Sequence, residues 1–180
     1  MRILLPILTA ILFACSPKDE REGLFGQLVE RESVEIYLSS YNLDSIPSDI
    51  GQLKKAKSLY ITKDSTGQWE VYPPESTIQE MTDDPPFRYV PEELTELTQL
   101  QNLGLVGLDL AKLPTDFDRL QHLDTLNLMM NKLNISNELD KLKKLENLKY
   151  LVVFGNKVDS ADIAELKRAN PKLEIIGGLE

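Results

Sequence analysis

The feature that most constrains this chain is a pair of aliphatic residues, two positions apart, that recurs at a nearly constant interval. The first members of successive pairs lie 23, 44, 23, 25 and 22 residues apart, and the long interval equals one 23-residue period plus 21 extra residues. An internal repeat of roughly 20–50 residues indicates a solenoid, in which each unit buries its apolar face against its neighbours. The pairs are Ile36/Leu38, Leu59/Ile61, Leu103/Leu105, Leu126/Leu128, Leu151/Val153 and Leu173/Ile175.

A second landmark, a proline after an aliphatic residue, recurs at Pro47, Pro91 and Pro114. Apolar residues three or four positions apart follow each proline, which predicts a short helical turn. The aliphatic pairs alternate with period two, which predicts short strands whose paired side chains point inward. The regular prolines argue against a helical bundle or coiled coil, because proline interrupts a helix.

Residues 123–133 match the pattern L-x-x-L-x-L-x-x-N-x-L, and the chain resembles the leucine-rich repeat family over about residues 33–176. The resemblance implies an α/β solenoid: a curved horseshoe with short parallel strands on the concave face and short helical or 3-10 turns on the convex face. We expect about five to six repeats within 33–180. The Asn position of the pattern is filled by Tyr41, Asp64, Leu108, Asn131 and Asn156, so only the last two of these turns follow it.

The 21 extra residues place an insertion at about 62–89. Two β-prone runs, at 60–63 and 68–72, flank a turn cluster and predict a hairpin that leaves the solenoid. A degenerate extra repeat is the alternative, although no aliphatic pair lies near Met81, where the period requires one. Long irregular insertions are often functional and sometimes merely mobile, and the sequence leaves both readings open.

The first residues of the chain have the layout of a secretion signal. Arg2 precedes an apolar run over 3–14 that ends at the only cysteine, Cys15. The run is shorter than the ~20 residues of a membrane-spanning helix and fits a signal peptide. Leu12-Phe13-Ala14-Cys15 resembles the lipobox of bacterial lipoproteins, which implies cleavage after residue 14 and acylation of Cys15, for example with palmitate. An ordinary cleaved signal, or an N-terminal anchor with a chance cysteine, is the alternative.

The expected organisation is therefore a signal peptide at 1–14, a lipidated tether and N-terminal cap at 15–32, and a leucine-rich repeat domain at 33–180. Several acyl chains would anchor the protein to a membrane of the bacterial cell envelope without spanning it. Within 15–32, four apolar residues have helical spacing and predict a helix that caps the first coil: Leu24, Phe25, Leu28 and Val29.

Residues after the lipobox bear on the destination. The residue after the lipobox cysteine is Ser16 and not the aspartate that resembles an inner-membrane retention signal. This difference from the signal favours the outer membrane. Lys18-Asp19-Glu20 is similar to a short Lys-acid-acid signal that directs some lipoproteins to the cell surface. A solvated charge cluster in a flexible tether is the alternative reading of those three residues.

Composition excludes several functions. The net charge of −9 and the pI near 4.7 have the wrong sign for binding nucleic acid. One cysteine and one histidine leave little for metal or general-base chemistry, and His122 has no catalytic partner placed by any motif. Asp83-Asp84 lacks the alternating ligands and the glycine of a calcium loop. We therefore expect no catalytic residues, metal or cofactor.

The outward residues of the expected strands form columns on the concave face. In the register above these columns are Glu35, Ser58, Asn102, Thr125 and Tyr150; then Tyr37, Tyr60, Gly104, Asn127 and Val152; then Ser39, Thr62, Val106, Met129 and Phe154. Exposed Met and aromatic residues are typical of contact sites. The candidate partner-binding residues are Tyr37, Tyr60, Val106, Asn127, Met129, Tyr150, Val152 and Phe154. The alternative is that the insertion or the C-terminal tail covers them as ordinary core.

These features together suggest a non-catalytic, membrane-anchored binding module that recognises a macromolecule, above all a protein, through the concave face. The step from fold to binding is an analogy, because the horseshoe also serves unrelated roles. A structural accessory subunit, or a self-associating component of an envelope complex, is the alternative. An enzyme would require a catalytic pair that the sequence does not display.

Overall fold

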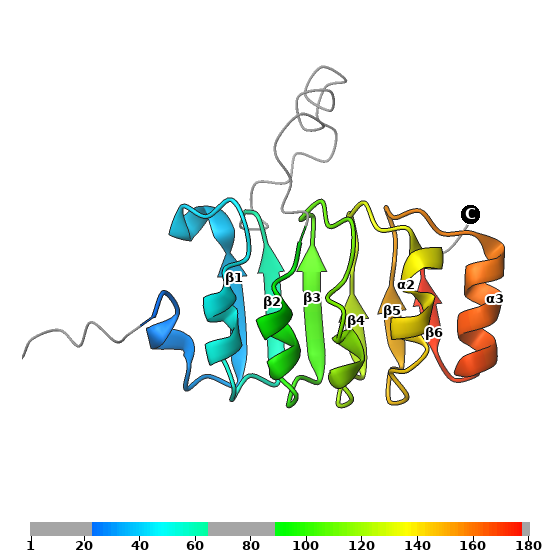
Figure 1. Cartoon of the computed structure of the whole chain (residues 1–180), viewed down its shortest axis with the longest axis horizontal. Coiled ribbons are helices and arrows are strands. Elements are labelled where there is room, and N and C mark those ends of the chain that lie inside the picture. Colours follow the sequence, from blue (N-terminus) through cyan, green and yellow to red (C-terminus); the bar gives the residue numbers. More distant parts are fainter. Residues whose placement is uncertain (1–22, 65–88, 178–180) are drawn as a thin grey trace, which may run out of the picture.

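The computed structural model describes residues 23–64 and 89–177 of the chain. Its strands form one parallel sheet in which each strand lies beside the next one in sequence, and helical segments cover one side of that sheet (Figure 1). This arrangement is the predicted leucine-rich repeat solenoid. The strands are β1 (Ser33–Tyr37), β2 (Ser58–Thr62), β3 (Asn102–Val106), β4 (Thr125–Asn127), β5 (Tyr150–Val152) and β6 (Glu174–Ile176).

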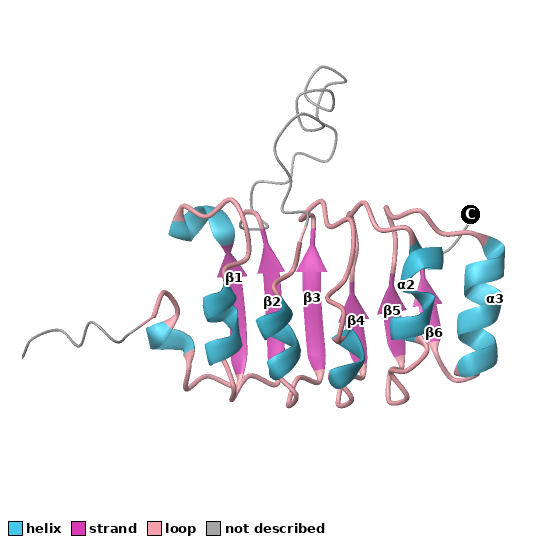
Figure 2. Ribbon diagram, viewed as in Figure 1, coloured by secondary structure: helices cyan, strands magenta, loops and turns pink. Residues whose placement is uncertain are grey.

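Short helices form the helical side (Figure 2). They are 3-10 segments in the early coils and α-helices in the last two. The described 3-10 segments are η1 (Gly26–Leu28), η2 (Leu38–Tyr41), η3 (Ser48–Gln52), η5 (Glu92–Glu96) and η6 (Phe117–Arg119), and the α-helices are α2 (Ile135–Leu142) and α3 (Ser160–Ala169). Pro47 and Pro91 stand directly before η3 and η5 in extended conformation. Because proline fixes its φ angle and donates no hydrogen bond, it starts these turns without loss of a bond.

Aliphatic side chains on alternate strand residues fill the space between the sheet and the helical side. Leu59, Leu103, Leu126 and Leu151 are Cα partners in adjacent strands, and each is at most 1% exposed. Their stacking gives every coil the apolar contacts that a single coil cannot make alone. The C-terminal coil is tied to the preceding one by a buried carboxylate, because Asp162 of α3 accepts a hydrogen bond from the Ser136 hydroxyl at 2.9 Å.

Asn131 forms the centre of a buried hydrogen-bond network in the turn after β4. Its Oδ1 accepts hydrogen bonds from the backbone N–H groups of Leu108 and Leu110, both at 3.1 Å, and its Nδ2 donates to the carbonyls of Leu105 and Leu128 at 2.7 and 2.8 Å. Asn156 repeats the arrangement one coil later, with its Oδ1 accepting from Leu133. The sequence prediction that these two turns follow the repeat pattern is therefore confirmed.

The predicted register is wrong by two residues in the first coil. Val34, not Ile36, is the Cα partner of Leu59, and Ile36 is the partner of Ile61. Leu38 lies beyond the strand at the start of η2, where its side chain is still fully buried. The buried side chain produced the misleading spacing, because an inward residue in a turn has the same apolar character as one in a strand.

The register of the last coil was also misplaced by two residues. Ile175, not Leu173, pairs with Leu151. Leu173 is buried just before β6, as Leu148 is just before β5. A terminal strand has a neighbouring strand on one side only. A shift in its register therefore leaves the spacing of the central pairs unchanged.

No strand lies between β2 and β3 in the sheet, because the two pair directly over Ser58–Thr62 and Asn102–Val106. This register excludes an extra repeat inserted between them. The predicted hairpin lies largely outside the described residues, as do the lipobox with Cys15, the charge cluster at 18–20 and Asp83-Asp84.

The N-terminal end of the array is covered by an aromatic pair. Phe25 is 1% exposed, and its ring meets that of Tyr41 edge to face, with 5.4 Å between the ring centroids. The turn η1 follows directly. The segment over 23–32 therefore forms a short 3-10 turn and not the helix expected from its apolar spacing. Within the described ranges, no helix has the length and apolar character that crossing a bilayer requires.

Candidate binding face

The side of the sheet opposite the helices is the candidate binding face, and we call it the open face. It is formed by the outward residues of the strands, which alternate with the buried ones. We include Met129 and Phe154, which follow the ends of β4 and β5 by two residues. Its described positions are Ser33, Glu35, Tyr37, Ser58, Tyr60, Thr62, Asn102, Gly104, Val106, Thr125, Asn127, Met129, Tyr150, Val152, Phe154, Glu174 and Ile176.

Large apolar side chains gather at the C-terminal end of the open face. Phe154 is 56% exposed and Tyr150 43%, while Met129 and Val152 are half-buried. Ile176, 53% exposed, is the Cα partner of Val152 and extends the group onto β6. We call these five residues the C-terminal apolar patch. Ile176 was not among the predicted contact residues because the predicted columns ended at the fifth strand and did not include β6.

The N-terminal half of the open face is more polar. With the corrected register, Glu35 lies beside Tyr60, and Tyr37 lies beside Thr62. The Tyr37 hydroxyl donates a hydrogen bond to Glu35 at 2.9 Å, and this bond raises the pKa of Tyr37. Partial burial, and then the charge of Glu35, raise the pKa of Tyr60. Tyr37 and Tyr60 are therefore diagonal neighbours, and Glu35 accepts a hydrogen bond from Tyr37 and lies beside Tyr60.

The position of the Tyr60 ring depends on a glycine of the next strand. A Cβ atom built on Gly104 would lie 2.3 Å from Cδ2 and 2.8 Å from Cε2 of Tyr60, so any other residue would displace the ring. Gly104 thus lets the ring lie close against the backbone of β3. The sequence placed both residues in one column but gave no sign of this contact.

Two of the outward residues are unavailable to a partner. Val106 is 1% exposed, and its Cα partner Thr62 is fully buried. The prediction that Val106 is a contact residue is therefore wrong, because these neighbouring side chains are enclosed at the ends of β2 and β3. Asn127, also a candidate, is half-buried, and its Oδ1 accepts the backbone N–H of Met129 at 3.0 Å, which holds the end of β4.

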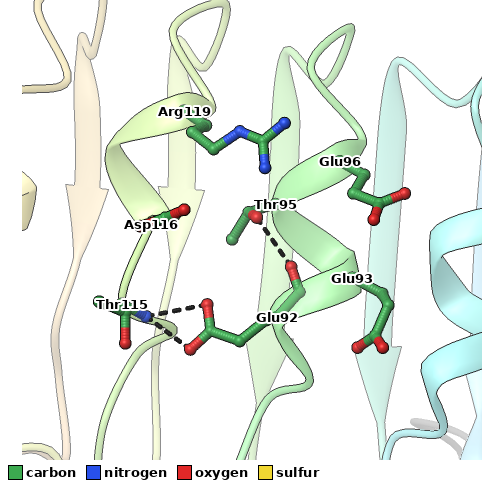
Figure 3. A pocket seen from close by; sticks show the side chains of 7 residues that line it. All are labelled: Glu92, Glu93, Thr95, Glu96, Thr115, Asp116 and Arg119. Carbon is green, nitrogen blue, oxygen red and sulfur yellow. Dashed lines mark hydrogen bonds between the residues drawn. The ribbon is translucent and has the colours of Figure 1, made fainter.

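A separate acidic pocket lies on the helical side, between η5 and η6 (Figure 3). The Glu92 carboxylate accepts the backbone N–H of Thr115 through both oxygens, at 2.8 and 3.0 Å, and the Thr95 hydroxyl donates to the Glu92 carbonyl. Glu96 forms an ion pair with Lys54 of the preceding coil. These carboxylates connect successive coils, so the pocket has a structural role.

The Glu92 contact predicts a small pH-dependent stabilisation. The hydrogen bonds from Thr115 lower the pKa of Glu92 in the folded chain. The stabilisation is therefore complete above the ordinary glutamate pKa and is lost as pH falls through the lower folded value. Because Glu92 is exposed, we expect Glu92→Gln to cost less than about 1 kcal/mol at pH 7. In urea unfolding, the difference between the two proteins should shrink below about pH 4; a constant difference would contradict the assignment.

The described residues contain no group of three or more His, Cys, Asp or Glu side chains placed to hold a metal ion. His122 is exposed, with its Nδ1 2.9 Å from the Thr98 carbonyl, and it lies between coils on the surface. The open face, with its apolar patch and its tyrosines, is therefore the best-defined candidate site of the described chain.

Known proteins that resemble this chain were found by structure and not by sequence. No family model matches the sequence, and no curated protein sequence matches it. Among solved structures, an internalin from Listeria monocytogenes is 17% identical, with a TM-score of 0.52 over 76% of this chain and 32% of that one. A leucine-rich repeat protein from Leptospira interrogans is 24% identical, with a TM-score of 0.46 over 74% and 34%.

The leucine-rich repeat ectodomain of an Arabidopsis thaliana receptor kinase is 23% identical, with a TM-score of 0.48 over 74% of this chain and 62% of that one. The chain thus spans about a third of the two bacterial proteins and less than two thirds of the plant ectodomain. Together with the six-stranded parallel sheet, the internalin match shows that the chain has the leucine-rich repeat fold.

Proposed function

We propose that the protein is a non-catalytic binding module that recognises a protein partner through the open face. The observation that carries this proposal is the C-terminal apolar patch, in which Tyr150 and Ile176 on the sheet and Phe154 in the turn after β5 are each more than 40% exposed. Large exposed apolar groups that share one face are typical of interaction sites, and aromatic residues dominate the binding energy of many interfaces.

The rigidity of the solenoid supports the same proposal. Tyr150, Val152 and Ile176 lie on strands whose opposite sides are packed into one continuous aliphatic core, and Met129 and Phe154 follow the ends of β4 and β5. A partner would therefore meet side chains that are already in place, which reduces the entropy lost on binding. Tyr37, Tyr60, Asn127, Met129 and Val152 complete the proposed contact surface around the patch.

Capture of partners from the detergent-solubilised envelope of the source cell, with the purified protein immobilised, tests the binding proposal. We expect a protein that is enriched saturably and is competed away by free protein. An accessory subunit is the second candidate, favoured by the same apolar patch, since permanent interfaces are more apolar than transient ones. Co-purification as a complex of constant stoichiometry would support that second candidate instead.

The proposal includes a lipid anchor at Cys15 in the bacterial envelope, with the outer membrane favoured and exposure at the cell surface as one orientation. It is supported by the resemblance of Leu12-Phe13-Ala14-Cys15 to a lipobox. Several acyl chains on one residue would hold the protein firmly, whereas one chain binds only marginally.

Cys15→Ser tests the anchor. We expect the wild-type protein to incorporate radiolabelled palmitate and to partition into the detergent phase, and the variant to lose both properties. The serine variant should accumulate with its leader uncleaved, because acylation precedes cleavage in lipoproteins that the lipobox resembles. Equal labelling of the two proteins would contradict acylation of Cys15, and an unlabelled but cleaved wild type would indicate an ordinary signal peptide.

A further inference from the structure

The charge of the open face has one sign. Among its described outward positions, Glu35 and Glu174 are carboxylates, and none is Lys or Arg. Lysines at the nearby edge of the sheet are already paired: Lys57 lies 2.9 Å from Glu32, and Lys149 lies 3.2 Å from Asp124. The net charge of −9 for the whole chain has the same sign.

Both carboxylates of the open face, Glu35 and Glu174, lack an ion pair within the described residues, and Glu35 is the one that lies beside the tyrosines. It is exposed, and it accepts one hydrogen bond, from the Tyr37 hydroxyl, with no ion pair in the described part of the chain. A neutral phenol does not cancel the charge of a carboxylate. The negative potential of Glu35 therefore extends to its neighbours, and the charge of Glu35 contributes to the raised pKa of Tyr60.

Tyr60 places an aromatic surface beside this charge. The ring lies against the backbone of β3 at Gly104, where a Cβ atom would meet it at 2.3 Å, and the residue is half-buried. The Cδ2–Cε2 side of the ring thus lies against the sheet. A Lys or Arg side chain over the remaining surface would gain both a cation–π contact and an ion pair with Glu35.

We propose, resting on the proposed function above, that Glu35, Tyr37 and Tyr60 form a site for a Lys or Arg side chain of the protein partner, and that the same partner segment places an apolar side chain on the C-terminal apolar patch. The charge complementarity of the open face identifies the partner segment as basic.

The spacing of the two sites restricts that segment further. Tyr60 lies on β2 and Tyr150 on β5, three strands away in the sheet. Adjacent strands are about 4.8 Å apart, so the two sites are roughly 14 Å apart across the sheet. An extended chain advances about 3.3 Å per residue. The basic and apolar residues of the partner should therefore be about four or five positions apart.

Peptide display tests this proposal with a defined probe. A library of random twelve-residue peptides is selected on the immobilised protein and, in parallel, on its Glu35→Gln and Phe154→Glu variants. Wild-type selection should enrich peptides with Lys or Arg about four or five residues from an aromatic or aliphatic residue. Selection on Glu35→Gln should keep the apolar residue and lose the basic one. Glu146→Gln, in the exposed turn after α2, is the matched control for charge and should behave like wild type.

One enriched peptide then enters a double-mutant cycle. Replacing its arginine with citrulline, a neutral isostere, should weaken binding to the wild type about 5- to 30-fold and should have little effect on Glu35→Gln. Tyr60→Phe should retain most of the affinity and Tyr60→Leu should lose it, because the ring is the contact. Gly104→Val should weaken binding as Tyr60→Leu does.

The outcomes separate this proposal from the one on which it rests. Enrichment of apolar peptides without a basic residue, or a citrulline effect equal in wild type and Glu35→Gln, would overturn the cation site and leave the binding face intact. If no peptide is enriched on the wild-type protein, the result would count against binding of an extended partner segment at the open face and against the cation site.

Discussion

Asn131→Ala is expected to destabilise the protein by about 3–5 kcal/mol, more than any surface substitution. The Asn131 amide satisfies four backbone groups of two adjacent coils, and the residue is 4% exposed. Alanine would leave buried N–H and C=O groups without partners, and each such group costs about 1–3 kcal/mol. Urea unfolding of the purified protein, followed by far-ultraviolet circular dichroism, measures the loss.

Two asparagines provide the matched controls. Asn156→Ala should cost less, about 1–2 kcal/mol, because Asn156 is half-buried and water can replace some of its bonds. Asn137→Ala should change stability by less than about 0.5 kcal/mol, since Asn137 is exposed on α2. A loss below about 1 kcal/mol for Asn131→Ala would show that the network contributes little to the solenoid.

Phe154→Glu is expected to weaken partner binding about 100-fold or more while leaving the fold intact. Phe154 is 56% exposed on the C-terminal apolar patch, so a carboxylate there remains solvated in the free protein. In a complex the same carboxylate would be buried without a partner, and central aromatic residues of interfaces typically contribute more than 2 kcal/mol. Unfolding of the variant should differ from wild type by less than about 0.5 kcal/mol.

Leu24→Glu is the control for this substitution, because Leu24 is also a large exposed apolar residue, at 43%, but precedes the first coil and lies off the open face. It adds the same charge and should leave binding unchanged. Strong destabilisation by Phe154→Glu would instead identify Phe154 as a packing residue and remove it from the proposed site.

The repeat period predicted the fold because it reports a property shared by every coil. Leu59, Leu103, Leu126 and Leu151 occupy equivalent inward positions, and their spacing survives the 21-residue insertion because β2 still pairs with β3. Asn131 and Asn156 were also identifiable, since a buried amide at that position serves the same backbone groups in each turn.

The two ends of the array could not be placed in the same way. Leu38 and Leu173 are buried outside the strands, in the turn after β1 and just before β6, so each mimicked a strand position. The error at the first strand moved Glu35 and Tyr37 by one column. Ile176 was missed because the predicted columns did not extend to the last strand. With the pairing corrected, Glu35 comes to lie beside Tyr60, which the cation site requires.

The sequence pattern could not predict which residues of the open face are buried. Alternation assigns Val106 and Phe154 to the same side of the sheet, yet Val106 is 1% exposed and Phe154 is 56%. Alternation gives the direction of a side chain but not what surrounds it. The contact between Gly104 and the Tyr60 ring is of the same kind, because it depends on how one side chain crosses to the next strand.

Binding of a protein partner at the open face is tested by affinity capture with the wild-type protein, Phe154→Glu and Leu24→Glu side by side. We expect one partner that wild type and Leu24→Glu enrich equally and that a folded Phe154→Glu fails to enrich. Equal capture by all three proteins would show that the partner binds elsewhere on the chain.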